Sequence, residues 1–344
     1  MKTVLITGGA GFIGSAFVHR LWDNYPEYKI IVLDLLTYAG STENFPVTSQ
    51  VANPGRFQFW FGDICNGELV DTLVSQSDIV VHFAAESHVT RSIYDNHTFF
   101  RTDVMGTHAI ANAVLKYRDK VERFIHISTS EVYGTAETEK MHEEHPLKPL
   151  SPYAAAKAGA DRLVWSYFTT YNIPATILRP FNNFGPRQHL EKVVPRFITS
   201  VLLDEPLTVH GDGSAARDFI FMEDTCRAID LIMHAPEGKV RGKIFNVGSE
   251  QHRSILEIAK DILRLMNEKE DKISLVGERP GQVFRHTCDA SYIQSTLGWN
   301  EKISWEDGLR QTIDWYTKNR SWWQKQVWMR HIPIVLADGK REMH

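Results

Sequence analysis

A turn rich in glycine decides the fold: Thr7-Gly8-Gly9-Ala10-Gly11-Phe12-Ile13-Gly14. The apolar run before it, residues 4–7, predicts a strand, and the apolar spacing after it, residues 12–22, predicts a helix. In that setting glycines let the backbone approach a phosphate, and the first N–H groups of the helix can hold a pyrophosphate. The turn therefore predicts a dinucleotide site that includes Gly8, Gly11, Phe12, Ile13 and Gly14.

An acidic residue identifies the expected dinucleotide. Asp34 closes the next predicted strand, residues 29–35, and no Arg or Lys follows it in residues 35–38. A carboxylate at this place accepts hydrogen bonds from ribose hydroxyls and repels a 2′-phosphate, which predicts NAD as the cofactor. Asp63 closes a later strand and is interpreted as an adenine contact or as a plain loop carboxylate. The other residues predicted at the cofactor are Thr37, Ile64, Ala84, Ala85 and Ser87.

Strands and helices alternate through the first half of the chain. Further strands are predicted at residues 57–63, 78–85, 123–129 and 175–180, and long helices at residues 99–117 and 153–171. This alternation predicts an α/β fold, a Rossmann-type doubly wound parallel sheet with a smaller α/β lobe at the C-terminal side. We expect a dinucleotide-binding domain over residues 1–180, to which residues 215–250 return, and a second lobe with a C-terminal tail over residues 181–344.

Composition restricts the possible partners. The 344 residues carry a net charge of -4, which predicts no binding to nucleic acid. No apolar run is long enough to cross a membrane, and no signal peptide precedes the first strand, so no membrane partner is expected. The three cysteines are far apart in the chain and form neither a disulfide framework nor a metal motif. We expect a cytoplasmic protein without a metal site.

A tyrosine and a lysine indicate redox chemistry on an alcohol. Tyr153 and Lys157 lie one turn apart on a predicted helix that starts at Ser151-Pro152. The ammonium can lower the pKa of the phenol, and a phenolate can take the proton of an alcohol as a hydride leaves its carbon. The same spacing also suits an exposed helix face. However, the pair follows a nucleotide-binding half-domain, and Glu131 adds a second base nearby in the sequence. Both features favour a catalytic role over an exposed helix face.

Several motifs together make the chain similar to a known family. It resembles the extended short-chain dehydrogenase/reductases and, within them, the nucleotide-sugar 4,6-dehydratases, most of all the dTDP-glucose 4,6-dehydratase group. The likeness extends from residue 1 to about residue 317. It rests on the glycine turn and on residues 34–40, Ala84-Ala85-Glu86-Ser87-His88-Val89-Thr90-Arg91-Ser92-Ile93, Ser151 to Lys157, Asn182-Asn183-Phe184-Gly185-Pro186, Arg217-Asp218-Phe219 and Arg279-Pro280-Gly281.

The resemblance implies a reaction in three steps on a nucleoside diphosphate-hexose. Tyr153 removes the C4 hydroxyl proton while a hydride passes from C4 to NAD, and Glu131 then takes the C5 proton. Water leaves from C6, and the hydride returns there to give a 4-keto-6-deoxy sugar. Thr129 would bond the C4 oxygen and Lys157 the nicotinamide ribose. The resemblance also implies a homodimer, formed through residues 99–117 and the helix that contains Trp165.

Some residues depart from the family pattern. Ser130 stands where the dTDP-glucose enzymes usually carry an aspartic acid that protonates the C6 hydroxyl. Gln282 and Arg179 also differ at places expected near the sugar or the base, so UDP-N-acetylglucosamine remains an alternative substrate. UDP-glucuronate decarboxylases share the Ser130-Glu131 pair. A decarboxylase, a 4-epimerase and a non-catalytic NAD-binding protein are the competing hypotheses.

The resemblance also places the nucleotide sugar in the second lobe. The residues at matching positions are Asn183, Glu191, Lys192, Arg217, Asn246 and Arg279, while Ser87, His88 and Arg91 follow the fourth predicted strand, where a loop could reach the sugar. The guanidinium groups of Arg217 and Arg279 suit phosphate oxygens. A surface ion pair is the alternative for Glu191 and Lys192, and a structural role the alternative for His88. Trp322, Trp323 and Trp328 near the C-terminus have no predicted role beyond a docking tail, a subunit contact or the second lobe.

Overall fold

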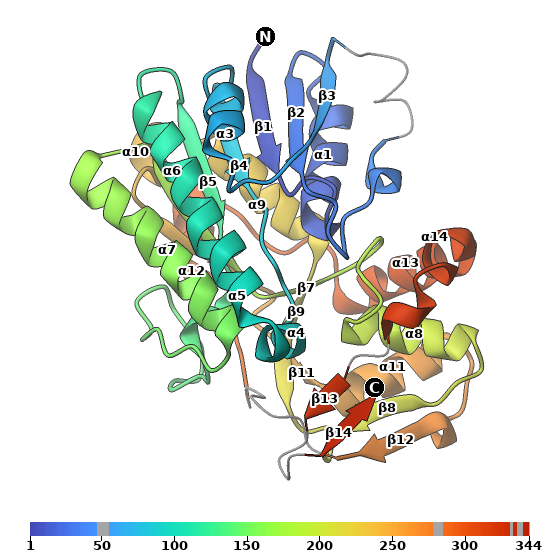
Figure 1. Cartoon of the computed structure of the whole chain (residues 1–344). Coiled ribbons are helices and arrows are strands. Elements are labelled where there is room, and N and C mark those ends of the chain that lie inside the picture. The colour runs from blue at the N-terminus through green and yellow to red at the C-terminus, as the bar shows by residue number, and fades with distance from the viewer. Residues whose placement is uncertain (47–54, 278–284, 331–332, 336–339, 344) are drawn as a thin grey trace.

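The computed structural model describes residues 1–46, 55–277, 285–330, 333–335 and 340–343. A seven-stranded sheet forms the first lobe, with the order β10-β6-β5-β4-β1-β2-β3 and parallel pairing throughout (Figure 1). This confirms the predicted doubly wound sheet. Its strands are β1 (Thr3–Thr7), β2 (Lys29–Asp34), β3 (Phe57–Phe61), β4 (Ile79–His82), β5 (Arg123–Ile127), β6 (Ala175–Pro180) and β10 (Ile244–Val247).

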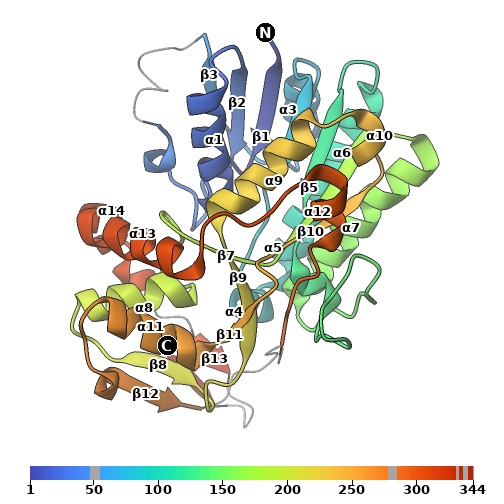
Figure 2. The same ribbon diagram turned by 180° about the vertical axis from the view of Figure 1, so that it is seen from behind.

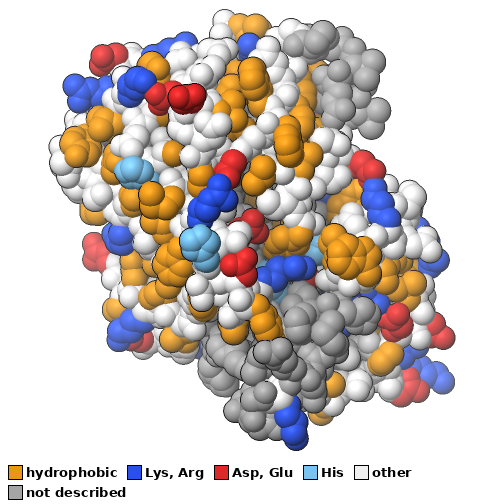
Figure 3. Space-filling view, in the orientation of Figure 1, with side chains coloured by type: hydrophobic (Ala, Val, Ile, Leu, Met, Phe, Trp, Pro, Cys, Tyr) orange, Lys and Arg blue, Asp and Glu red, His pale blue; other side chains and the backbone are white. Residues whose placement is uncertain are grey.

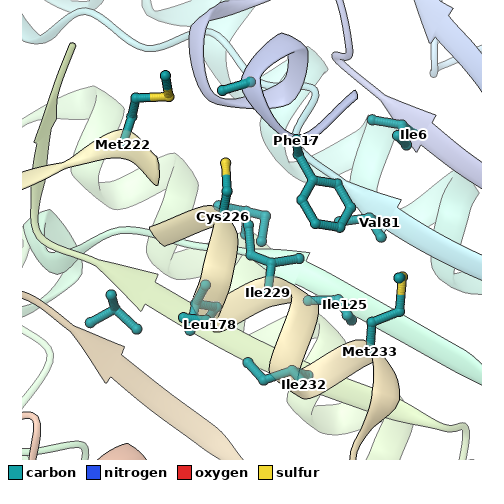
Figure 4. Close-up of a cluster of buried hydrophobic side chains, with 14 of the residues drawn as sticks. Ile6, Phe17, Val81, Ile125, Leu178, Met222, Cys226, Ile229, Ile232 and Met233 are labelled. Atoms are coloured by element: carbon teal, nitrogen blue, oxygen red, sulfur yellow. The ribbon is translucent and has the colours of Figure 1, made fainter. Parts of the chain in front are cut away.

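Helices bury both faces of this sheet. Side chains alternate between the faces, so Val4 and Ile6 pack into one cluster and Leu5 into another. On one face α1 (Phe12–Asn24) and α9 (Met222–His234) lie side by side (Figure 2). Figure 4 shows how Cys226, Ile229 and other side chains of α9 point toward Phe17 and the strands. The other face carries α3 (Gly67–Val74), α6 (Thr107–Lys116) and α7 (Pro152–Tyr171).

The helix predicted at residues 99–117 is not continuous. It is built from α5 (Asn96–Phe99), a π-helical segment η2 (Phe100–Gly106) and α6. A π segment widens the helix by one residue per turn and shifts which side chains face inward, and such segments often occur at functional sites. Because the apolar spacing on both sides stays helical, the sequence pattern alone does not reveal this segment.

The second lobe packs below the strand ends in Figure 1. Its strands are β7 (Asn182–Phe184), β9 (Ala216–Phe221) and β11 (His252–Ser254) in one sheet, and β8 (Leu207–His210) and β12 (Ile273–Val276) in another. Of residues 215–250, α9, α10 (Glu237–Val240) and β10 lie with the large sheet, whereas β9 pairs with β7 and β11. The remaining helices and strands are α4 (Val89–Tyr94), α8 (Val193–Leu202), α11 (Ile255–Leu265), α12 (Ser291–Leu297), α13 (Trp305–Lys318), α14 (Arg320–Gln324), β13 (Pro333–Val335), β14 (Arg341–Met343) and the 3-10 turns η1 (Thr42–Asn44), η3 (Ser130–Tyr133), η4 (Glu270–Lys272) and η5 (Val327–Arg330).

The tryptophans of the C-terminal region connect the lobes. Trp322 and Trp323 are buried in the core of the second lobe, while Trp328 is exposed. The indole N–H of Trp322 donates to Asn44 Oδ1 at 2.9 Å, and the Asn44 amide donates to the carbonyl of Ala10 at 2.8 Å. The second lobe thereby supports the glycine turn from outside. Within the described parts of the chain, no helix has the length and apolar character needed to cross a bilayer.

Candidate functional site

A cavity of about 520 Å³ lies where the parallel strands end and the second lobe begins. The residues after β1, β2, β4, β5 and β6 form its floor, and Phe197, His210 and Arg217 reach it from the second lobe. Ligands of open α/β sheets bind at this edge, beyond the carboxyl ends of the strands. The cavity is therefore the candidate site.

The glycine turn forms one end of the cavity. Gly8 has a φ of +70°, and a Cβ at Gly14 would stand 2.3 Å from the Gly8 carbonyl oxygen, so neither position accepts a side chain without a backbone shift. Gly11 is the N-cap of α1 and makes no side-chain capping bond, while Phe12 and Ile13 line the cavity. The helix thus presents its N-terminus to the cavity, as a pyrophosphate site requires.

Asp34 stands beside this turn. Its Oδ2 accepts from the Ala10 N–H at 2.9 Å and its Oδ1 from the Leu36 N–H at 2.8 Å. Burial raises the pKa of Asp34, and these two backbone bonds oppose that shift. A carboxylate has about four acceptor sites, so both oxygens can still accept ribose hydroxyls. The other predicted cofactor residues all line the cavity: Thr37, Asp63, Ile64, Ala84, Ala85 and Ser87. These residues fit NAD.

Tyr153 and Lys157 enter the cavity from the first turns of α7. Ser151 caps the helix through the Ala154 N–H at 3.1 Å, and Pro152 occupies the first helical position. Lys157 is buried, and its Nζ donates to the Ile127 carbonyl at 2.8 Å. Burial raises the pKa of Tyr153, although a hydrogen bond with Thr129 opposes the shift.

In the protein alone the pKa of Tyr153 is raised, and its lowering by Lys157 stays a prediction for the site with NAD bound. The net shift is upward because burial disfavours the phenolate and the carboxylates of Asp103 and Glu131 add to this effect. The Lys157 ammonium is directed instead at the end of β5.

Asp103 is a buried acid that the sequence did not identify. It lies in η2, where its Oδ1 accepts from the Glu86 N–H at 2.8 Å, and its Oδ2 has no hydrogen-bond partner among the described residues. Burial raises the pKa of Asp103, and the nearby Lys157 ammonium opposes the shift. One Asp in a helical pattern resembles an exposed position, and only the π segment turns this carboxyl inward.

Replacing Asp103 by asparagine is expected to change how stability depends on pH. A carboxyl whose pKa is raised on folding stabilises the native state below its unfolded pKa, near 4, and loses that contribution as pH rises through the folded pKa. Asparagine does not titrate. In thermal unfolding, the stability of Asp103→Asn relative to the wild type should therefore rise between pH 4 and pH 8. We expect this rise in the difference in unfolding free energy to be at least about 1 kcal/mol. An equal difference at both pH values would contradict the assignment.

The turn η3 places three predicted catalytic residues at the end of β5. Thr129 and Glu131 line the cavity, and Thr129 Oγ1 accepts from the Glu131 N–H at 3.2 Å. Ser130 is fully buried, and its hydroxyl lies 3.4 Å from His286 Nδ1. A 3-10 helix has three residues per turn, so neighbouring side chains diverge by about 120°. Unlike Thr129 and Glu131, Ser130 therefore does not line the cavity.

Arg179 lies beneath the cavity and not in its wall. Its guanidinium forms two bonds to Asp161 of α7, at 2.8 and 2.9 Å, and one to the Tyr133 hydroxyl at 2.9 Å. Asp161 also accepts from Ser128 at 2.7 Å. The interpretation of Arg179 as a residue near the sugar is wrong. This buried pair instead ties the helix of Tyr153 to the turn of Glu131.

Most of the predicted substrate residues are brought together. Those that line the cavity are Ser87, His88, Asn183, Glu191, Lys192 and Arg217. Lys192 donates through Nζ to the Ser87 carbonyl at 2.6 Å, which connects the start of α8 to the loop after β4. Glu191 is a buried side chain and not part of a surface ion pair.

Two predicted substrate residues lie elsewhere. Arg91 donates to Glu191 at 2.8 Å and covers the Tyr38 ring at 4.1 Å, so it supports the wall from behind. Asn246 is fully buried under η3, bonded to the Tyr133 hydroxyl and the Met141 carbonyl, so its prediction as a substrate ligand is wrong. Arg279 lies outside the described residues, as does Gln282.

Three basic residues of the cavity were missed. Arg196, His189 and His210 all line it. Arg196 follows Lys192 by four residues on α8, so the two share a helix face, and this spacing could have revealed it. His210 ends β8, and its ring bonds the Gly277 carbonyl at 3.0 Å. No sequence pattern connected that strand with the cavity.

Known proteins show the same arrangement. A family model described as GDP-mannose 4,6 dehydratase matches residues 5–312. The chain is 45% identical to the low-salt glycan biosynthesis protein Agl12 of Haloferax volcanii, over 91% of this chain and 98% of that protein. It is 39% identical to a trifunctional UDP-glucose 4,6-dehydratase/UDP-4-keto-6-deoxy-D-glucose 3,5-epimerase/UDP-4-keto-L-rhamnose-reductase of Arabidopsis thaliana, over 94% of this chain but only 48% of that longer protein.

A solved structure is also similar to this chain in both fold and sequence. The dTDP-glucose 4,6-dehydratase DesIV of Streptomyces venezuelae, determined with NAD and TYD bound, superposes with a TM-score of 0.88. The two chains are 38% identical, and the match covers 94% of this chain and 99% of that one.

Proposed function

Because the chain belongs to the nucleotide-sugar 4,6-dehydratase family of extended short-chain dehydrogenase/reductases, and is thus an NAD-dependent hydro-lyase, we propose that its cavity dehydrates a nucleoside diphosphate-glucose. One observation carries the assignment of residues. Tyr153, Thr129 and Glu131 line a single cavity that also contains the glycine turn. A base for the C4 hydroxyl and a base for C5 therefore reach the same bound sugar.

Tyr153 acts on the C4 hydroxyl. Bound NAD would supply the acceptor for the C4 hydride and its donor for C6, and its oxidised ring would place a positive charge in the cavity. A cation near the phenol lowers its pKa and offsets the effect of burial. Thr129 holds the C4 oxygen through the hydroxyl that bonds Tyr153, and Tyr153 takes the proton of that oxygen. The Lys157 ammonium donates a hydrogen bond to the Ile127 carbonyl at the end of β5. We expect the ribose of the nicotinamide to lie beside this ammonium.

Glu131 acts on C5. A ketone at C4 acidifies the neighbouring C–H bond, so a carboxylate can remove its proton and leave an enolate. The enolate expels the C6 oxygen, which takes a proton and departs as water. The double bond between C5 and C6 then receives a hydride at C6 and a proton at C5. The two protons removed, from O4 and C5, equal the two returned, to the leaving oxygen and to C5.

The diphosphate is assigned to basic residues of the second lobe. Lys192, Arg196 and Arg217 all line the cavity. Burial lowers the pKa of both arginines, that of Arg196 to about 10, yet both remain charged at neutral pH. Two guanidinium groups and one ammonium suit the charge of a diphosphate.

The test is mass spectrometry of nucleotide sugars incubated with the enzyme and no added reductant. The panel contains dTDP-glucose, UDP-glucose, UDP-N-acetylglucosamine, GDP-mannose, CDP-glucose and UDP-glucuronate. Loss of one water from a glucose nucleotide is expected. Loss of water from UDP-N-acetylglucosamine alone would replace the proposed sugar, and loss of carbon dioxide from UDP-glucuronate alone would overturn the dehydratase assignment.

The proposed assembly is a homodimer. Phe100 and Met105 of η2 and Tyr171 of α7 expose 44%, 56% and 46% of their surface. The two segments are neighbours in the fold, and Figure 3 shows hydrophobic side chains over the region of α5, α6 and α7, on the left of the view. Exposed apolar side chains gathered on one face mark an association surface. The three cysteines, all within the described residues, are free thiols, which supports the proposal of a reducing cytoplasm.

A charge on this face is expected to separate the subunits. Met105→Glu would bury a carboxylate against apolar side chains of the partner, at a cost of several kcal/mol. Size-exclusion chromatography with light scattering should show a dimer for the wild type and a monomer for the variant. Leu275→Glu is the matched control, because Leu275 is exposed by 61% on β12 of the other lobe. A wild-type monomer, or a dimer of Met105→Glu, would refute the proposed interface.

A further inference from the structure

A histidine from the far end of the chain lies directly behind the proposed C5 base. The side chain of His286 is 1% exposed, and its three polar neighbours all belong to η3 or follow it. Nδ1 lies 4.0 Å from Glu131 Oε1 and 3.4 Å from Ser130 Oγ, and Nε2 lies 2.6 Å from the Gly134 carbonyl oxygen. The Phe181 ring packs against the imidazole edge-on at 6.2 Å.

These contacts define the tautomer of the neutral ring. A carbonyl oxygen can only accept, so the Gly134 contact places the hydrogen of His286 on Nε2. Nδ1 then presents a lone pair to Ser130 and Glu131. The Ser130 hydroxyl can donate to it, and an ionised Glu131 carboxylate cannot. A protonated Glu131 carboxyl can donate to it, so this lone pair favours the protonated form of the base.

The reaction needs a hydrogen-bond acceptor beside Glu131 while this residue carries the C5 proton. Glu131 must hold the C5 proton until the C6 oxygen leaves, and a proton must reach that oxygen. Ser130 is fully buried and turned toward His286, so its hydroxyl is not available to the sugar. Arg217 lines the same cavity. By these distances, Ser130 and His286 lie together behind the Glu131 carboxyl, away from the cavity.

We propose that His286 is a positioning residue for Glu131: it accepts a hydrogen bond from the carboxyl that has taken the C5 proton, so that the same carboxyl delivers this proton to the C6 oxygen. The inference rests on the proposed role of Glu131. In the step, the C5–H bond breaks and an O–H bond forms on Glu131. The C6–O bond then breaks as that proton moves to the departing oxygen, water leaves, and Glu131 returns to its ionised form with His286 unchanged.

The surroundings keep His286 neutral. Burial lowers the pKa of the imidazole, and the charges of Arg217 from β9 and of His145 from the loop after η3 act in the same direction. Glu131 and the Gly134 carbonyl oppose them. A proton on Nδ1 at acid pH would favour the ionised carboxylate and weaken proton uptake from C5. Elimination should therefore decline on the acid side as His286 becomes charged.

Single-turnover kinetics with the nucleotide sugar that the panel identifies tests the proposal. His286→Phe should leave C4 oxidation, seen as the absorbance of reduced nicotinamide, at the wild-type rate and slow water loss by about 10- to 100-fold. His286→Gln supplies an uncharged acceptor, so it should recover water loss at neutral pH and lose the acid decline. Ser130→Ala is the matched control, since it removes the other partner of Nδ1, and should keep the wild-type rate of water loss.

The outcomes separate this inference from the proposed function. Wild-type water loss in both His286 variants would overturn the inference, and so would an equal slowing of C4 oxidation and water loss, which indicates a structural role only. Circular dichroism melting identifies a variant that fails to fold, and His286→Gln then decides the question. Wild-type water loss in Glu131→Gln would instead refute the proposed function of Glu131, whatever the His286 variants do.

Discussion

Tyr153→Phe is expected to reduce turnover by a factor of about 10²–10⁴, the usual contribution of a positioned acid or base. The variant removes one oxygen atom, so the C4 hydroxyl loses the group that takes its proton, and no hydride can leave C4. The ring contact with Phe99, 6.1 Å between centroids, remains available to phenylalanine. The structure should therefore be retained, and NAD should bind with the wild-type affinity.

The measurement is product formation by mass spectrometry beside NAD binding by calorimetry. Tyr167→Phe is the matched control, because Tyr167 belongs to the same helix but bonds Asn112 on the outer face. It should turn over like the wild type. Turnover of Tyr153→Phe within tenfold of the wild type would exclude Tyr153 as the base, and loss of NAD binding would assign it a structural role.

Glu131→Gln is expected to stop the reaction between its oxidation and elimination steps. The amide keeps the shape of the side chain but cannot take the C5 proton, so water loss should fall by about 10²–10⁴-fold. C4 oxidation does not use Glu131. The absorbance of reduced nicotinamide should therefore rise on mixing with substrate and persist, and C5 should not exchange its hydrogen with heavy water.

Glu137→Gln provides the control for this prediction. Glu137 lies just beyond η3, is exposed, and pairs with Lys148 at the surface. Its replacement should leave both steps unchanged. Product formation by Glu131→Gln at the wild-type rate, or absence of the reduced cofactor signal, would assign the C5 proton to another residue.

Features that depend on neighbours in the chain were predictable. The glycine turn lies between a strand and a helix, and the close approach of Gly14 to Gly8 is set within the turn itself. Asp34 is placed by its own strand, and Tyr153 and Lys157 by one turn of one helix with Ser151 as its cap. A local pattern suffices in these cases because short-range geometry alone positions the side chain.

Features that depend on distant segments were not predictable. The approach of His286 to Ser130 joins residues 156 apart, and the bond of Asn246 to Tyr133 joins residues 113 apart. The direction of Arg91 was decided by Glu191, a hundred residues away. In each case the side chain is of a type that often binds ligands. In the folded protein it instead packs against a partner from a distant segment.

The sequence by itself determined the doubly wound sheet and the NAD site and brought the proposed bases at residues 131 and 153 together, since strand ends and helix turns carry these groups to one edge of the sheet. Only the tertiary structure decided which polar groups face the cavity and which support it from behind. Ser130, Arg179 and Asn246 are turned into the protein, and Asp103 is brought inward by η2. The reason is physical: a buried polar group takes whatever partner the packing provides, and packing joins segments that no local pattern connects.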